Sequence, residues 1–434
     1  MTISLPQFIS LLGTTPPGDM TYPPINCGTG LLDETQESGS ENDSFMLVTE
    51  HVTPEDFTSF LAAMEQNGAR KGFSRALCGN LFAEFLWGSR IVYTYYTAQK
   101  SEARFILDPV SVPLGRFAIP DSAPVREGSA LMQFSLKYGS MIPGHSCDCG
   151  MLYAIRLRDN SLIIVDGGEK EQATDEAMAE LITRLYDLAG TPESEPLRIS
   201  LWAATHNHDD HMDVFIKLMR LLEGRMMLGR VMFNFPSATL MHDQNPSELL
   251  LKERIRRYFP DVLFLKPHTG MCFPIPQGTV EIIATHEDIL PRSSYAEEGR
   301  TYRGMNESTT FFKITFDGTS VLFLGDAEMG NEEALATLYP EGTLRTDYLQ
   351  CAHHMINAVP RIYAMVQAKK LLIPQGRYMS SLRNGDIVAR LTGLFGAENM
   401  YYAGDCTYVF SVKDGEESIS LYEQKGYVYD GSEL

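Results

Sequence analysis

After about residue 125 the chain alternates between short apolar runs and abrupt polar stops. The runs occupy residues 162–165, 199–204, 320–324, 348–352 and 371–373. Runs of this length and composition are typical of inner strands in sheets that helices cover. The polar stops carry Asp166, a histidine cluster, Asp326 and a His353-His354 pair. Because functional groups gather past strand ends in layered α/β folds, we expect these side chains to meet at one edge.

The first part of the chain follows a different pattern. Residues 54–68 read as a helix, and residues 80–87, 90–97 and 103–107 read as strands. Residues 13–45 are loop-like in composition, and the prolines of residues 108–127 indicate a linker. We therefore predict a small α+β domain of unknown role over residues 1–125 and a second domain over residues 126–434.

Composition narrows the classes of function. The chain has 434 residues and a formal net charge of −20, which disfavours duplex DNA as a partner. One basic stretch, with Lys252, Arg254, Arg256 and Arg257, reads as a solvated helix face. We find no apolar run long enough to span a membrane, no positively charged N-terminal start, and only seven scattered cysteines. These features favour a cytoplasmic protein without membrane contact.

The most informative segment is residues 205–213, Thr-His-Asn-His-Asp-Asp-His-Met-Asp. It follows an apolar run of strand length, so His206 and His208 should point to the same side of an extended chain. A helix should begin next, with Asp209 as its cap and with Asp210 and His211 on its first turn. Imidazole and carboxylate groups are common zinc ligands, so this spacing indicates metal binding more than a histidine-rich surface turn.

If the strand ends lie side by side, enough ligands converge for two metal ions. They are Asp166, His206, His208, Asp210, His211, Asp326 and one of His353 and His354. Asp166 and Asp326 also have the simpler reading of turn residues next to glycine. We expect Asp166 to orient a metal-bound histidine as a hydrogen-bond acceptor instead of binding metal itself.

These motifs and their order resemble the metallo-β-lactamase superfamily over residues 128–434. The resemblance implies an α/β fold, a four-layer αββα sandwich with metals at one edge. It also implies that His206 and His208 serve a first ion, that Asp210 and His211 serve a second, and that Asp326 bridges both. One late histidine would complete the second site, and we favour His353 over His354. Asp210 and Asp326 would then be the catalytic carboxylates.

The stretch Asn306-Glu-Ser-Thr-Thr narrows the likeness, because it is similar to the hydrolase domain of competence-type DNA-uptake proteins and their soluble relatives. In those proteins this stretch replaces a Gly-His segment that supplies a further ligand. Two departures affect the site. His286 lies some twenty residues earlier and is either a ligand, a substrate contact or a loop histidine, and Met355 stands where relatives usually have glycine.

The resemblance implies a metal-dependent hydrolase that uses a metal-activated water and needs no Ser, Cys or Lys nucleophile. We expect two Zn²⁺ ions per chain, with Mn²⁺ or Fe²⁺ as alternatives, and a small or short phosphoester substrate. A different ester, a thioester or a lactone is the alternative within the enzyme class. A catalytically weak metal-binding or sensing protein is the alternative outside it. Self-association into a homo-oligomer is compatible with all of these readings.

Overall fold

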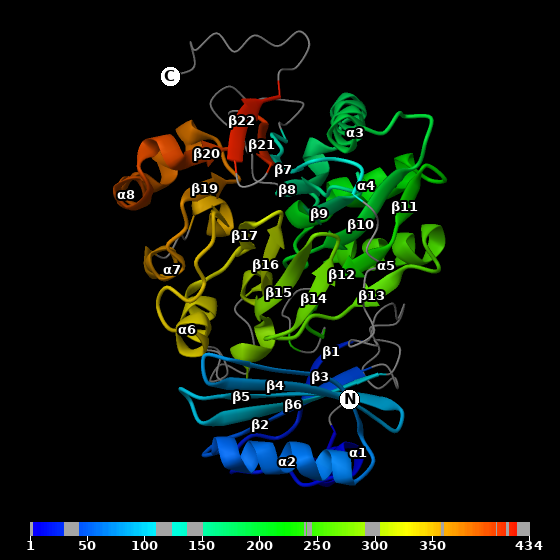
Figure 1. Ribbon diagram of the computed structural model, residues 1–434, viewed down its shortest axis with the longest axis vertical. Coiled ribbons are helices and arrows are strands. Elements are labelled where there is room, and N and C mark those ends of the chain that lie inside the picture. The colour runs from blue at the N-terminus through cyan, green and yellow to red at the C-terminus, as the bar shows by residue number, and fades with distance from the viewer. Residues whose placement is uncertain are drawn as a thin grey trace.

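The computed structural model describes residues 3–29, 43–109, 124–136, 151–237, 240, 245–290, 304–356, 360–404, 406–413 and 416–422. These residues form three sheets with helices around them (Figure 1). One sheet belongs to the N-terminal unit, which we define as the segment from α1 to β6. The other two belong to the sandwich, which we define as the segment from β7 to β22.

The N-terminal unit is a six-stranded antiparallel sheet in the order β1-β2-β6-β5-β4-β3. Its elements are α1 (Leu5–Leu12), β1 (Ile25–Thr29), β2 (Asp43–Thr49), α2 (Pro54–Gln66), β3 (Arg70–Leu77), β4 (Asn80–Trp87), β5 (Arg90–Thr97) and β6 (Glu102–Pro109). Both helices cover one face of the sheet, and the other face turns toward the sandwich (Figure 1).

Three strands of this unit differ from the sequence prediction. β1 and the start of β2 fall in residues predicted as loop, and β3 was not predicted. β3 has an alternating pattern of exposed and half-buried residues with two basic residues at its start, which is the composition of an edge strand. β6 also extends through Asp108 and Pro109, which were predicted as the start of the linker.

The first sheet of the sandwich has the order β13-β12-β10-β9-β8-β7-β21-β22, with β11 paired to β10. Its strands are β7 (Ser129–Gln133), β8 (Leu152–Arg156), β9 (Leu162–Asp166), β10 (Leu197–Ala203), β11 (Met226–Leu228), β12 (Arg230–Met232), β13 (Leu263–Leu265), β21 (Tyr408–Lys413) and β22 (Glu416–Leu421). β9, β10, β12 and β13 are parallel, so their carboxyl ends lie at one edge.

The second sheet of the sandwich has the order β14-β15-β16-β17-β18-β19-β20. Its strands are β14 (Cys272–Ile275), β15 (Gly278–Ala284), β16 (Phe311–Phe316), β17 (Thr319–Phe323), β18 (Tyr348–Gln350), β19 (Lys370–Ile373) and β20 (Met400–Tyr402). β17 to β20 are parallel, and β15 runs in the same direction because it is two antiparallel steps from β17.

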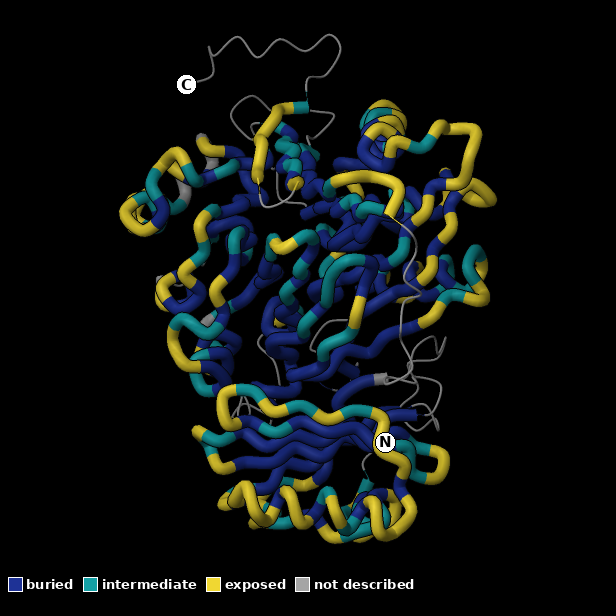
Figure 2. The backbone as a smooth tube through the Cα atoms, viewed as in Figure 1, coloured by how far each residue is buried: buried dark blue, intermediate teal, exposed yellow. Residues whose placement is uncertain are grey.

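Helices cover the outer face of each sheet, which gives the four-layer αββα sandwich predicted from the sequence (Figure 1). On the first sheet lie α3 (Asp175–Ala189), α4 (Asp213–Leu221) and α5 (Pro246–Tyr258); on the second lie α6 (Met329–Leu338), α7 (Pro360–Val366) and α8 (Arg377–Phe395). The sheets pack through aromatic side chains such as Tyr153 and Phe323, whose ring centroids are 5.3 Å apart. Most strands are buried, but β22 is exposed along its whole length, and the outer faces of the helices are exposed (Figure 2).

The N-terminal unit sits on the edge of the sandwich where the parallel strands end. Tyr93 Oη donates to the carbonyl of Thr269, just past β13, over 2.8 Å. Tyr95 Oη donates to Oδ1 of Asp288, just past β15, also over 2.8 Å. Both tyrosines belong to β5 and lie two residues apart. The N-terminal unit therefore lies beside the side chains that are placed at that edge of the sandwich.

A buried ionic cluster joins the two parts of the chain. His268 contacts Asp108 through Nε2 at 2.5 Å and Glu287 through Nδ1 at 2.8 Å. Lys266 pairs with Asp108 at 3.0 Å, and the Tyr93 ring stacks on the His268 ring at 4.8 Å. Burial alone would lower the pKa of His268, but the carboxylates of Glu287 and Asp108 outweigh it and raise that pKa to about 9.

Among the described helices, none combines the length and apolar composition that a membrane crossing requires.

Candidate metal centre

Two histidines of the sequence motif face each other directly after β10. Nε2 of His206 lies 3.0 Å from Nδ1 of His208. The backbone is extended at His208, but residues 205–207 form a bend and not the continued extended chain that the sequence predicts. Together with Asp326 they offer three donor atoms within 4.8 Å of one another. His206 is fully buried, whereas His208 is half-buried.

A second group of donors lies beside the first. It contains Asp210, His211, Asp326 and His354, again with donor atoms within 4.8 Å of one another. Nε2 of His211 lies 3.2 Å from Oδ1 of Asp326, and Nε2 of His354 lies 3.0 Å from Oδ2 of Asp210. Asp326, at the end of β17, belongs to both groups. One carboxylate thus stands between two sets of imidazoles.

The local backbone differs from the helix start predicted at Asp210. Asp209–His211 forms a short 3₁₀ turn, and α4 begins at Asp213 with Met212 at its cap position. Asp209 therefore does not cap α4. The tighter turn separates Asp210 and His211 from the helix that follows.

The late histidine pair is arranged opposite to the sequence-based preference. His354 joins the second donor group, whereas His353 is outside both groups. Nε2 of His353 lies 3.8 Å from Oδ2 of Asp326 and 3.2 Å from the amide nitrogen of Asn306. Sequence adjacency could not separate the two, because the turn they occupy is irregular: both histidines have positive φ, 48° and 47°.

Met355 continues this left-handed stretch with φ of 65° and is completely buried. The position is one that glycine adopts without strain, which gives a physical reason for the glycine expected there from the resemblance. Here a methionine occupies it, and its side chain belongs to the core between the second sheet and its helices. Burial of this side chain offsets the backbone cost.

Asp166 orients a histidine from the end of β9. Its Oδ2 accepts a hydrogen bond from Nδ1 of His211 at 2.9 Å, and its Oδ1 accepts one from the backbone nitrogen of Thr205 at 2.7 Å. The contact fixes the imidazole so that Nε2 points to the donor group. Asp166 itself lies outside both groups.

His286 and Asn306, the remaining candidates, take different positions. His286 is buried away from both donor groups, and its Nε2 contacts Oδ1 of Asn234 at 3.2 Å. Asn306 lies near the site, where its amide nitrogen contacts His353 and, at 3.3 Å, Oε1 of Glu328. Asn306 Oδ1 is buried without a hydrogen-bond partner.

The donor set fits a divalent cation. Nε2 of His211, Nε2 of His354 and Oδ1 of Asp326 are buried and make no hydrogen bond of normal geometry, although they lie within ion-pair distance of one another's group. Burial opposes the charged forms, yet the mutual attraction of these groups raises the pKa of His354 to about 10 and holds that of Asp326 well below its usual range. Buried polar atoms that make no normal hydrogen bond and converge on one point are what a metal ion would satisfy.

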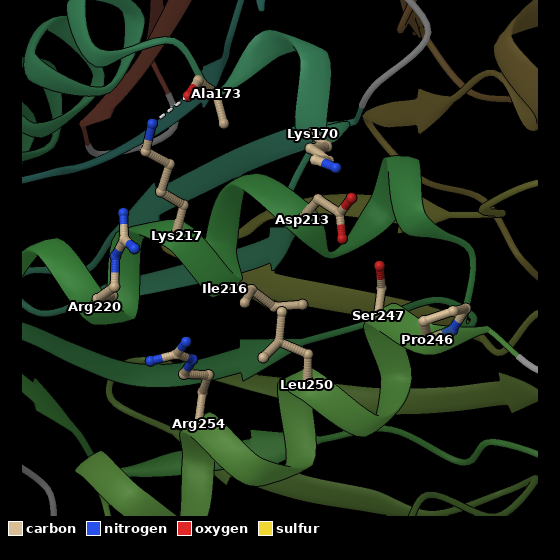
Figure 3. Close-up of a pocket in the computed structure, with 10 residues that line it drawn as sticks. All are labelled: Lys170, Ala173, Asp213, Ile216, Lys217, Arg220, Pro246, Ser247, Leu250 and Arg254. Atoms are coloured by element: carbon tan, nitrogen blue, oxygen red, sulfur yellow. Dashed lines mark hydrogen bonds between the residues drawn. The ribbon is translucent and has the colours of Figure 1, made fainter.

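A groove with basic residues runs between α4 and α5, the helices that begin closest to the histidine motif (Figure 3). It encloses about 540 Å³. Arg220 and Arg254 lie at one end, Ile216 and Leu250 form the middle, and Asp213, two residues after His211 in the chain, lies at the other end (Figure 3). Four of its lining residues are basic, Lys170, Lys217, Arg220 and Arg254, although the chain has a net charge of −20.

Comparison with known proteins shows likenesses in structure alone. No protein-family model matches the sequence, and no curated protein matches it. Three similar solved structures have these values: the metallo-β-lactamase fold protein YhfI from Bacillus subtilis (12% identity, 68% of this chain and 100% of that chain, TM-score 0.36); CmlA, a diiron β-hydroxylase from Streptomyces venezuelae (13%, 67% and 55%, 0.37); and Zn²⁺-bound PqqB from Methylobacterium extorquens (10%, 67% and 99%, 0.35).

All three TM-scores lie below 0.5. The assignment of the architecture therefore rests on the strand order and the helix layers described above, and the assignment of the site rests on its own donor atoms.

One set of residues near the site escaped the sequence interpretation. Lys252 was predicted on a solvated helix face, but it is buried and pairs with Glu248, which in turn contacts Asn207. A glutamate and a lysine four residues apart, Glu248 and Lys252, were the only signal in the sequence, and such pairs are common on exposed helices.

Proposed function

We propose that the protein is a metal-dependent hydrolase whose substrate is a phosphoester or phosphodiester. The observation that carries the proposal is the position of Asp326, which is shared by two adjacent groups of buried metal-binding side chains. A carboxylate shared in this way would let two ions be held side by side, as in a two-metal hydrolytic site. His206, His208 and Asp326 would hold the first ion, and Asp210, His211, His354 and Asp326 the second.

When bound, the two ions would supply an activated water and stabilise the negative charge that develops on oxygen. The chain's own residues prepare the site for them. Asp166 keeps a proton on Nδ1 of His211, which leaves Nε2 as the nitrogen that would bind the metal. His353, outside the donor groups and partly exposed beside Asn306, lines the approach to Asp326.

Zinc is the metal that we propose, because four imidazoles and two carboxylates, buried or half-buried, suit zinc. Manganese or iron remains an alternative for the same donors, since affinity order alone does not select the metal.

Two observations support a phosphoester over another ester, a thioester or a lactone. The arginines of the α4–α5 groove favour an anionic substrate, since guanidinium groups bind phosphate in a bidentate manner. The stretch beginning at Asn306 is also similar to the hydrolases of competence-type proteins. The acidic surface disfavours a long duplex, so we propose a small or short single-stranded substrate.

A second candidate function is a metal-loaded sensing or binding protein with weak catalysis. The observation that favours it is the small donor set of the first position, with two imidazoles and one shared carboxylate. In that case the N-terminal unit, which flanks the same edge, would recognise the partner.

The deciding experiment is hydrolysis of bis-p-nitrophenyl phosphate by the purified chain, with added zinc or manganese, beside elemental analysis of bound metal. We expect two ions per chain and turnover that is lost on chelation and in His208→Ala. His51→Ala is the matched control, because His51 is an exposed histidine of the N-terminal unit. Tight metal binding without turnover on phosphoesters, carboxylic esters, thioesters and lactones would instead support the sensing function.

A further inference from the structure

The residue between the first two metal-directed histidines is anchored to a helix. Asn207 is 3% exposed, and its Nδ2 donates to Oε2 of Glu248, in the first turn of α5, over 2.8 Å. Its backbone carbonyl accepts a hydrogen bond from Nδ2 of Asn245 at 2.7 Å. Both the side chain and the backbone of Asn207 are therefore bound to the beginning of α5.

Each of these two partners is itself held in place. Oε1 of Glu248 pairs with Nζ of Lys252 at 2.5 Å, so that its other oxygen is directed at Asn207. Asn245 is the N-cap of α5, and its Oδ1 accepts a hydrogen bond from the backbone nitrogen of Ser247 at 2.9 Å. The anchor is therefore a rigid part of the helix end.

The burial of the Glu248–Lys252 pair needs a reason. Glu248 is 5% exposed and Lys252 is 3% exposed. Removing two charges from water costs several kcal/mol per ion, so a buried ion pair contributes little net stability. A buried pair can instead specify one arrangement among several, and here it specifies the direction of a carboxylate oxygen.

The bend at residues 205–207 connects this anchor to the metal centre. His206 and His208 meet at the first donor group, whereas the side chain of Asn207, which lies between them in the chain, is outside both groups and contacts α5. Rotation of the segment would swing both imidazoles together. The two hydrogen bonds between Asn207 and α5 oppose that rotation without contact with a metal ion, and a longer one, from Oγ of Ser308 to Oδ1 of Asn207 at 3.4 Å, adds to them.

We propose that Asn207, Asn245 and Glu248 are positioning residues that hold His206 and His208 in the geometry of the first metal position. The inference rests on the proposed metal centre and is independent of the substrate. The second position has a separate support, the contact from Asp166 to His211, so loss of the α5 anchor acts on one position only.

The test compares two double variants that differ in a single acceptor group. Glu248→Leu with Lys252→Met removes both buried charges together, so that no lone charge remains, and also removes the acceptor for Asn207. Glu248→Gln with Lys252→Met removes the same charges but keeps an acceptor oxygen. The two proteins thus isolate the hydrogen bond from the ion pair.

Zinc affinity is measured by competition with a chromophoric chelator in two backgrounds. His354→Ala leaves the first position, and His208→Ala leaves the second. In the first background we expect the leucine variant to bind zinc 10–100-fold more weakly than the glutamine variant, the range typical of groups that orient metal ligands. In the second background we expect the two variants to bind equally.

Equal affinities of the two variants in the His354→Ala background would overturn the proposal, as would equal losses in both backgrounds, which indicate a general loss of structure. No substrate enters the measurement. The hydrolase activity could therefore be absent while the zinc affinities support the positioning role. Equally, the activity could be present while the zinc affinities contradict that role.

Discussion

Oδ2 of Asp166 accepts a hydrogen bond from Nδ1 of His211 at 2.9 Å, and both side chains are completely buried. The contact joins the end of β9 to the turn after β10. It fixes which nitrogen of the imidazole carries the proton, and thereby which one can bind metal. Asp166 has a φ of 58°, a conformation that aspartate and asparagine tolerate better than most residues.

Replacing Asp166 should weaken the second metal position. We expect Asp166→Ala to lower zinc affinity there by 10–100-fold, because His211 loses its acceptor. Asp166→Asn keeps one acceptor oxygen and suits the backbone, so its loss should be much smaller. Competitive titration in the His208→Ala background measures the effect. Equal affinities of wild type and Asp166→Ala would contradict the role of this contact.

The two late histidines should differ in metal content. His354→Ala removes a member of the second donor group, so we expect about one ion per chain instead of two. His353→Ala should keep both ions, because Nε2 of His353 contacts Asn306 and lies 3.8 Å from Asp326. Elemental analysis of both variants decides the matter, and loss of an ion in His353→Ala alone would reverse the assignment.

The α4–α5 groove should contribute to binding of longer substrates only. Seven residues separate Asp213 from Arg220, which corresponds to about 10 Å along a helix. We expect the double variant Arg220→Ala with Arg254→Ala to raise KM roughly 5–10-fold for a short single-stranded oligonucleotide. Charge-assisted hydrogen bonds are worth about 1.5–3 kcal/mol when buried, and contacts in an open groove are worth less. The kinetics of this double variant with bis-p-nitrophenyl phosphate should not change.

Arg257→Ala is the control for the groove variant, since Arg257 lies on the same helix but not among the residues that line the groove. An equal rise of KM for both substrates, or a rise with the control, would show that the groove is not a substrate subsite.

The ionic cluster under the N-terminal unit should make stability depend on pH. The pKa of His268 is raised to about 9 in the folded chain, from about 6.5 when unfolded. Its charged form therefore stabilises the fold fully below pH 6.5, and this contribution is lost as the pH rises through 9. The size of the shift corresponds to on the order of 3 kcal/mol.

The measurement is the free energy of unfolding of wild type and of His268→Gln between pH 6 and 10. We expect the difference between the two to shrink as the pH rises. Asp108, Glu287 and Lys266 keep their charges over this range, because the pKa values of the two acids are lowered and that of the lysine is raised. A difference that is constant with pH would mean that His268 is neutral in the folded protein.

The sequence predicted the features that depend on local pattern. The strands from β9 to β19 that carry the site were visible as apolar runs, and their shared edge followed from their parallel direction. The candidate donors at that edge could be named because each follows a strand, and their binding of metal stays a prediction.

Features that depend on long-range contact were not predictable. Whether His353 or His354 joins the donor group depends on an irregular turn, which no periodicity encodes. Lys252 has the spacing of an exposed ion pair and is buried only because α5 packs over the histidine motif. β3, an edge strand with two basic residues at its start, lacks the composition by which the other strands were recognised.

The packing of β5 and β6 on the sandwich has a consequence for how the chain folds while it is being synthesised. Asp108, at the end of β6, meets its partners Lys266 and His268 only after more than 150 further residues have been added. Until then the face of the N-terminal sheet that later contacts the sandwich carries an uncompensated carboxylate and the uncovered rings of Tyr93 and Tyr95. During synthesis on the ribosome the early sheet should thus need a chaperone or a delay, and a fragment ending near residue 125 should aggregate when it is produced alone.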